Sequence, residues 1–146
     1  MKYEEFKAAE EYIDWLLLSN RGTQSFAKKE DLIKLATFYN LSFKNNATKE
    51  ELYTLILSCT TRKELAHKFN AGVSSYEYQQ KFNISGKEVK RMERLGFISI
   101  TGQITFRAYG KYRKAPLYDI FEFYSLTLDD VQKILKQNIN RKKETE

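Results

Sequence analysis

Apolar residues in the middle of the chain follow a helical spacing that is interrupted by one tight turn. Tyr78 and Phe82 are four positions apart, so they share one face of a first helix. Ser85 is a good N-cap and Glu88, three positions later, completes a capping box, which predicts a second helix beginning at Gly86. The positions expected to be buried in this helix pair are Tyr78, Phe82, Ile84, Val89 and Met92.

The second predicted helix separates apolar from basic residues. Val89 and Met92 point to one side, and the cations fall mostly on the other: Lys87, Lys90, Arg91 and Arg94. With the tight turn in front, this is the spacing of a helix-turn-helix, whose second helix suits the DNA major groove between two phosphate backbones. Lys87 and Lys90 are the expected base readers, and Arg94 lies nearer phosphate. The alternative is a helical hairpin whose cations only solvate its outer face.

Helices are also expected on both sides of this pair. Residues 2–19 carry apolar side chains at helical spacing, and this face either packs on the chain's own core or forms a homodimer contact. A helix over 61–69 begins with the capping box of Thr61 and Glu64. A closing helix over 127–140 precedes a charged tail that is expected to fray.

Residues 28–58 contain two short apolar-periodic segments separated by an extended polar link. The segment resembles the SAP domain and its helix-extended-loop-helix relatives, and the matching positions are Leu32-Ile33-Lys34-Leu35, Leu41, Lys49-Glu50-Glu51-Leu52 and Ile56. Asn45-Asn46 stands where such modules usually have a glycine. The resemblance implies contacts to a nucleic-acid backbone from Lys28, Lys29, Lys44 and Lys49. The alternative is a helical hairpin that only spaces or docks.

Beyond Leu95 the period of the apolar residues changes from helical to alternating. The pattern predicts a strand over 97–100, a turn at Thr101-Gly102-Gln103 and a return strand over 104–107. A basic loop over 110–114, a third short strand over 115–118 and a helix over 119–124 follow. The cations of this region are Arg107, Lys111, Arg113 and Lys114.

Residues 61–125 are expected to form a helix, a helix-turn-helix, a β-hairpin and a cationic loop, in this order. This order resembles the winged helix-turn-helix family, especially its MerR-like and excisionase-like branch. The resemblance implies double-stranded DNA as the partner, with the basic residues of the wing at the backbone or the minor groove. Tyr109 and Tyr112 either add phosphate contacts or pack under the loop. Gln79 replaces the usual small residue of the first motif helix.

The charge distribution agrees with a polyanionic partner. Residues 61–116 hold 12 basic and 4 acidic side chains, a net +8, whereas the whole chain carries +6. The excess therefore sits in the middle of the chain, in the predicted helix-turn-helix and wing.

The chemistry of an enzyme is not indicated. One cysteine, Cys59, and one histidine, His67, cannot build a disulfide or a His/Cys metal site, and no phosphate-binding glycine loop, GxSxG or HExxH motif is present. We expect no catalytic activity, cofactor or metal. The acidic, amphipathic N-terminus is unlike a signal peptide, and no apolar run approaches membrane-spanning length, which favours the cytoplasm.

The expected fold is mainly α with a small β-hairpin wing. It divides into a helical N-terminal region over 1–59 that contains the SAP-like module, a winged helix-turn-helix over 60–126, and a C-terminal helix and tail over 127–146. The expected function is sequence-directed binding of double-stranded DNA, in transcriptional control, excision or replication accessory work. The composition favours a low-GC bacterium, its phage or a mobile element. The alternative is a non-enzymatic adaptor that binds a host or phage protein.

Overall fold

The computed structural model describes residues 2–18 and 27–145. Within them the chain forms eight α-helices, one short 3-10 helix and one antiparallel β-hairpin, so the expectation of a mainly helical fold with a small hairpin is confirmed. The elements are η1 (Lys2–Glu5), α1 (Ala9–Leu18), α2 (Lys29–Phe38), α3 (Lys49–Ile56), α4 (Arg62–Lys68), α5 (Ser75–Phe82), α6 (Gly86–Arg94), β1 (Ile100–Ala108), β2 (Lys111–Tyr118), α7 (Ile120–Ser125) and α8 (Leu128–Thr145).

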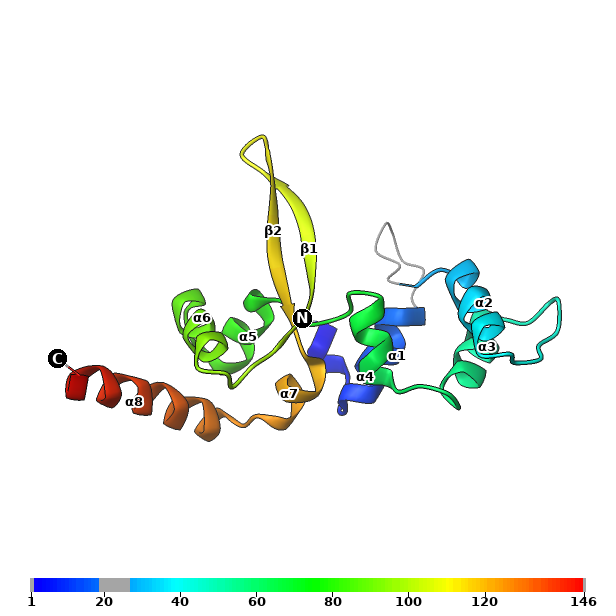
Figure 1. Cartoon of the computed structure of the whole chain (residues 1–146). Helices are drawn as coiled ribbons and strands as arrows, with labels where there is room; N and C mark the ends of the chain where they lie inside the picture. The colour runs from blue at the N-terminus through cyan, green and yellow to red at the C-terminus, as the bar shows by residue number, and fades with distance from the viewer. Residues whose placement is uncertain (1, 19–26, 146) are drawn as a thin grey trace.

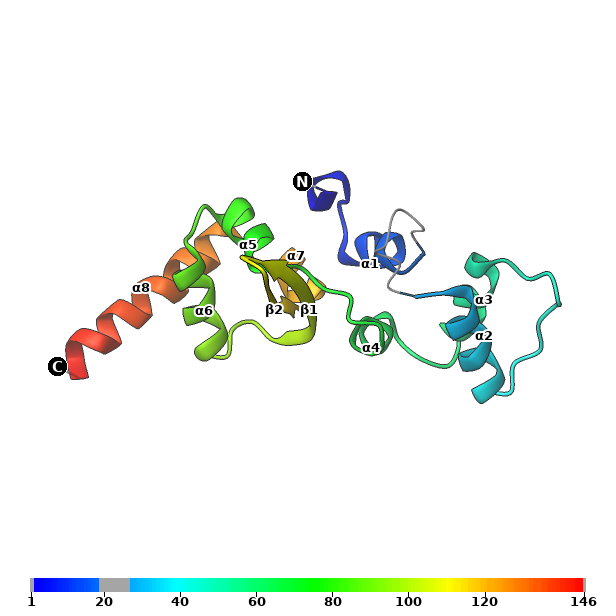
Figure 2. The same ribbon diagram turned by 90° about the horizontal axis from the view of Figure 1, so that it is seen from above.

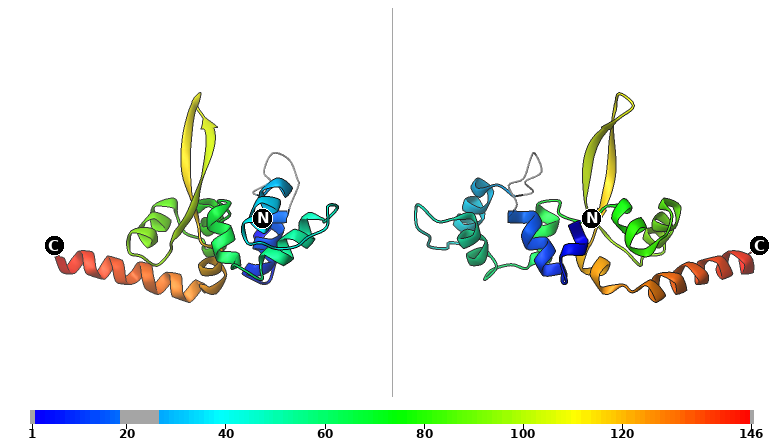
Figure 3. Two further views of the ribbon diagram at one scale, coloured as in Figure 1. Left: turned by 45° about the vertical axis from the view of Figure 1, so that its right-hand side comes forward. Right: turned by 180° about the vertical axis from the view of Figure 1, so that it is seen from behind.

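The helices lie along an extended body from which the hairpin projects. The α2–α3 pair forms one end and α8 the other, with α1, α4 and α7 between them (Figures 1 and 2). The hairpin of β1 and β2 rises from the middle of the body, beside α5 and α6, and projects from it in both views of Figure 3.

The capping signals in the sequence mark the helix starts correctly. The Ser85 hydroxyl accepts a hydrogen bond from the Glu88 backbone N–H at 3.2 Å, and the Glu88 carboxylate accepts one from the Ser85 N–H at 3.0 Å. Asn83 ends α5 with φ +52°, a left-handed conformation that asparagine tolerates better than most residues. The tight turn between α5 and α6 therefore follows from local chemistry.

The interior of the α5–α6 pair is the predicted one. Tyr78, Phe82, Val89 and Met92 are buried, and Ile84 in the turn is half-buried against the same apolar cluster. Gln79 lies opposite Gly86: a Cβ added at Gly86 would be 3.4 Å from the Gln79 amide nitrogen, an ordinary van der Waals distance.

Tyr78 carries a buried hydroxyl that has no hydrogen-bond partner among the described residues. Replacing Tyr78 by phenylalanine keeps the ring contacts and removes an unsatisfied polar group, so we expect the free energy of unfolding to stay unchanged or to rise by about 1–2 kcal/mol. Urea denaturation of the Tyr78→Phe protein measures this change. A decrease of more than about 1 kcal/mol would show that the hydroxyl is satisfied in solution.

The hairpin differs from the sequence-based expectation. β1 runs through Thr101-Gly102-Gln103, where a turn was predicted, and pairs directly with β2. The turn is instead at Tyr109 and Gly110, both with positive φ, +53° and +75°. Gly102 serves a close approach: a Cβ there would lie 2.7 Å from Asn70 Oδ1. The predicted basic loop and third strand together form β2, so the hairpin is longer than expected.

The base of the hairpin is tied to the link between α4 and α5. The backbones of Val73 and Tyr118 exchange hydrogen bonds at 2.7 and 2.9 Å, which adds a single bridge to the outer edge of β2. Gly72 permits this contact, because a Cβ there would lie 2.7 Å from the Tyr118 carbonyl oxygen. The hairpin is thus held in a fixed position relative to the helices at its base.

The N-terminal region is organised differently from the prediction. The expected continuous helix over 2–19 is wrong, because η1 ends at Glu5 and α1 begins at Ala9; residue 19 lies outside the described residues. Tyr3, in η1, contacts α7: its ring packs on Phe123 and its carbonyl accepts a hydrogen bond from the Tyr124 hydroxyl at 2.8 Å.

The apolar face of α1 packs within the chain, against α4 and α7. The buried residues of this face therefore pack on the chain's own core, the first of the two alternatives, and a homodimer contact stays a prediction. Asp14 connects the same region to α3 and α4, since its carboxylate accepts hydrogen bonds from Tyr53 and Arg62 at 2.6 and 2.8 Å. Asp14 thus links α1 to residues on both sides of position 59.

At the other end, α8 is longer than predicted and continues to Thr145, including most of the tail that was expected to fray. Val131, Ile134 and Leu135 are buried, and the helix packs against α6.

Candidate nucleic-acid interface

The basic residues of α6 share one exposed side of the helix. Positions 87, 90, 91 and 94 lie within one face of a 3.6-residue period, while Val89 and Met92 face the core. Lys87, Lys90 and Arg94 are exposed and Arg91 is half-buried. The structure therefore brings together the four α6 cations that the sequence nominated.

Glu93, an acidic residue of α6, contacts the hairpin. Glu93 Oε1 accepts a 2.6 Å hydrogen bond from the Tyr118 hydroxyl and lies 3.6 Å from Lys90 Nζ. Burial, together with the Glu93 carboxylate, raises the pKa of Tyr118 above its ordinary value, so the phenol stays protonated and donates. This contact joins α6 to the end of β2 and places Lys90 at the foot of the hairpin.

The four cations of the hairpin are all exposed, and they lie on both of its faces. The register pairs Arg107 with Tyr112 and Thr105 with Lys114, which puts Arg107 and Lys114 on one face. Lys111, opposite Ala108, and Arg113, opposite Phe106, lie on the other face. A hairpin with this distribution presents positive charge to anions on either side of it.

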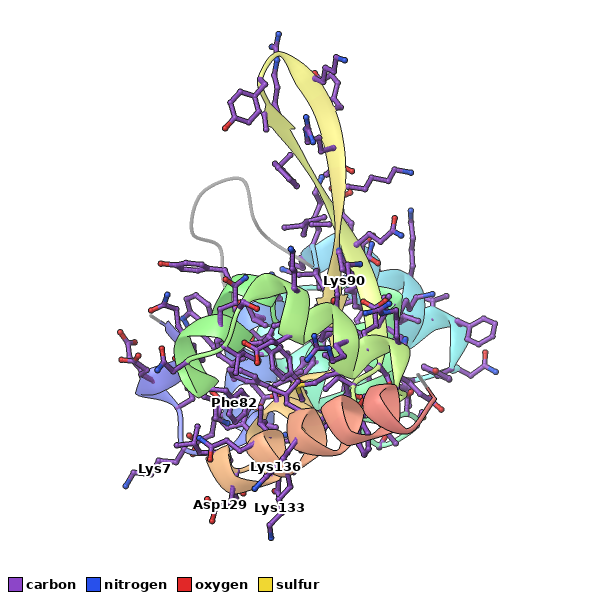
Figure 4. All side chains as sticks on the ribbon, turned by 90° about the vertical axis from the view of Figure 1, so that its left-hand side faces the viewer. Lys7, Phe82, Lys90, Asp129, Lys133 and Lys136 are labelled. Carbon is purple, nitrogen blue, oxygen red and sulfur yellow. The ribbon has the colours of Figure 1, made fainter. Side chains whose placement is uncertain are left out.

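The α6 cations and the hairpin belong to the same side of the molecule. Lys90 lies on the surface of α6 from which the hairpin rises, whereas Lys133 and Lys136 of α8 lie on the opposite side (Figure 4). The hairpin cations stand above Lys90 along the projecting strands. We refer to Lys87, Lys90, Arg91, Arg94, Arg107, Lys111, Arg113 and Lys114 as the basic surface.

The cations assigned to the SAP-like module are only partly at the surface. Lys28, Lys29 and Lys44 are exposed, but Lys49 is 8% exposed, and burial lowers the pKa of its ammonium. Lys49 is therefore less accessible to a phosphate than the other three lysines of this module. No signal in the sequence indicated this burial. The α2–α3 pair lies beyond α4 from α6, separate from the basic surface (Figure 1).

Another lysine of the basic central block is also turned inward. The Lys81 ammonium lies 4.5 Å from the centroid of Phe123 and 5.3 Å from that of Tyr124, and it donates to the Phe123 carbonyl. Burial lowers the pKa of Lys81. The Lys81 ammonium thus connects α5 to α7 and does not belong to the basic surface. The net charge of residues 61–116 is therefore larger than the positive charge that is exposed to a partner.

A shallow groove lies between α2 and the C-terminal end of α4, and the sequence did not indicate it. It encloses about 450 Å³ and is lined by Asp31, Lys34, Leu35, Phe38, Tyr39, Lys68 and Phe69. Phe38 is 76% exposed at this groove, with its ring edge against Tyr39.

The described residues contain no group of three or more His, Cys, Asp or Glu side chains that could hold a metal ion. Cys59 and His67 are both exposed; Cys59 lies in the turn between α3 and α4, and His67 lies in α4. Within residues 2–18 and 27–145, no helix is both long enough and apolar enough to cross a membrane.

Comparisons with protein-family models, with curated proteins and with solved structures find no match to this chain.

Proposed function

We propose that the chain is a non-enzymatic protein that binds double-stranded DNA through a winged helix-turn-helix formed by α4, α5, α6 and the β1–β2 hairpin. The observation that carries the proposal is the basic surface: the exposed face of α6 and the projecting hairpin carry four cations each and lie on the same side of the molecule. Such a surface complements the closely spaced phosphates of a duplex.

The packing beneath the surface supports the same proposal. Val89 and Met92 hold the back of α6 on the core, and the Glu93–Tyr118 hydrogen bond and the Val73–Tyr118 bridge hold the hairpin beside it. A duplex can therefore meet both parts without first ordering them, which lowers the entropic cost of binding. The bridge also places the segment before α5 beside β2, which agrees with the proposed winged arrangement.

In the proposed complex α6 enters the major groove. Lys87 and Lys90, near the start of the helix, reach toward base edges, and Arg94 contacts a phosphate. The hairpin cations contact the adjacent backbone, and Lys28, Lys29 and Lys44 extend the contact if the duplex continues past α4. The role is that of a regulator of transcription, or of an accessory factor in excision or replication.

A second candidate is an adaptor that binds another protein. The specific observation in its favour is the groove between α2 and α4, where Phe38, Tyr39 and Phe69 offer an apolar surface with Lys34 and Lys68 beside it. An apolar segment bearing a carboxylate fits such a groove. This candidate leaves the basic surface unused.

Salt dependence distinguishes the two candidates. Fluorescence anisotropy with a labelled duplex of about 25 base pairs, over a salt series, measures the slope of log K against log salt. If the six cations of the basic surface other than Lys87 and Lys90 meet phosphates, the slope is about −5. A slope near zero, or no duplex binding at low salt, would contradict the proposal and leave the adaptor.

A further inference from the structure

The tip of the hairpin holds a residue whose backbone does not suit its side chain. Tyr109 has φ +53° and Gly110 has φ +75°, the two positive values that a two-residue hairpin turn of type I′ requires. Asparagine or aspartate before glycine is the favoured pair for this turn. Among the described residues, the other non-glycine positions with positive φ are all asparagine: Asn40, Asn70 and Asn83.

The fold does not account for a tyrosine at this position. The Tyr109 side chain is 96% exposed, so its ring contributes almost no buried apolar area. The Arg113 guanidinium carbon lies 6.0 Å from the ring centroid, at the outer limit of a cation–π contact in full solvent. A bulky residue in the left-handed region costs free energy, and such cost concentrates where a residue has a function.

The surroundings of the ring indicate the chemistry of its partner. Cations lie on both faces of the hairpin just behind the tip, Arg107 on one and Lys111 and Arg113 on the other. Tyr112 is a second exposed ring, 79% exposed, with the Arg107 guanidinium carbon 6.0 Å from its centroid. The flat ring of Tyr109 is at the tip of the hairpin, and positive charge lies on both faces behind it. This arrangement complements a nucleobase that lies between two phosphate backbones.

We propose that Tyr109 stacks on a nucleobase of the bound DNA, with the hairpin entering between the two backbones. The inference rests on the proposed function and adds a contact that the basic surface alone does not supply. Two sources can present a base face to the ring: a base step opened within the duplex, or the last base pair beside a single-stranded extension. In both cases the ligand is the face of a nucleobase.

The test uses the full chain and its Tyr109→Asn and Tyr109→Phe variants. Asparagine suits the turn, so the Tyr109→Asn protein is expected to fold at least as stably, which thermal unfolding checks. Loss of one base stack weakens duplex binding by about fivefold to 100-fold. The slope of log K against log salt stays unchanged, because no charge is removed. Tyr109→Phe keeps the ring and retains the wild-type affinity.

Photocrosslinking to DNA containing 5-iodouracil locates the contact. Thymines are replaced one at a time in a blunt duplex and in a duplex with a single-stranded extension. A crosslink to Tyr109, identified by mass spectrometry and reduced at least tenfold in Tyr109→Asn, is the expected result. Its presence in the blunt duplex identifies an opened step, and its presence only with the extension identifies the junction.

Two outcomes overturn the inference and are distinguishable from each other. If the wild-type protein binds duplex with a steep salt slope, and Tyr109→Asn binds equally well without any crosslink at the tip, the stacking contact is wrong and the proposed function stands. If the wild-type protein binds neither the blunt duplex nor the duplex with a single-stranded extension, the proposed function fails and the stacking contact fails with it.

Discussion

Changing Phe123 to alanine is expected to lower the free energy of unfolding by about 3–5 kcal/mol. Phe123 is fully buried, and its ring centroid lies 4.9 Å from that of Tyr78, 5.1 Å from that of Tyr3 and 6.1 Å from that of Phe82. One side chain thus joins η1, α5 and α7, and its removal leaves a cavity between three elements. Urea denaturation followed by circular dichroism measures the loss.

Phe38→Ala is the matched control, because it deletes the same atoms from a side chain that is 76% exposed. We expect the free energy of unfolding to change by less than about 0.5 kcal/mol. Equal losses for the two variants would contradict the difference in burial between Phe123 and Phe38 on which the proposed core rests.

Changing Lys90 and Arg91 together to alanine is expected to weaken duplex binding at least tenfold, about 1.4 kcal/mol or more. Both side chains lie on the outer face of α6, where each can reach a base edge or a phosphate. Alanine is a strong helix former, so the stability of α6 should not fall. Fluorescence anisotropy at one fixed salt concentration compares the variant with the wild-type protein.

Lys133→Ala combined with Lys136→Ala provides the control for charge alone. The two exposed lysines are on α8, on the side of the molecule opposite Lys90 (Figure 4). This variant loses the same two charges, and its affinity for duplex is expected to fall by no more than about twofold, since the side chains contact no phosphate. Equal losses for the two double variants would mean that net charge, and not the basic surface, governs binding.

The local parts of the fold could be predicted from the sequence. The capping box of Ser85 and Glu88 and the spacing of Tyr78, Phe82 and Val89 involve residues within a few turns of one another, so a short window of sequence contains the whole interaction. For the same reason the basic face of α6 was predictable: helical periodicity alone places its cations on one side.

The hairpin and the buried lysines depend on partners that are distant in sequence. Gly102 looks like a turn residue until Asn70 is seen to approach it, and Tyr109 does not resemble one because a tyrosine rarely takes positive φ. Lys81 looks solvated until the rings of α7 are placed beside it. Tertiary contacts decide Gly102 and Lys81, and an uncommon backbone conformation sets Tyr109 apart; neither composition nor periodicity reports any of the three.

The central claim is that α6 and the hairpin bind one duplex together. The most direct measurement is the slope of log K against log salt for a variant with alanine at Lys90 and Arg91 of α6 and at Arg113 and Lys114 of the hairpin. Each lost phosphate contact removes about 0.9 from the slope, and Lys90 is assigned to a base edge, so the account predicts a slope about 3 shallower than that of the wild-type protein. A slope equal to that of the wild-type protein would contradict it.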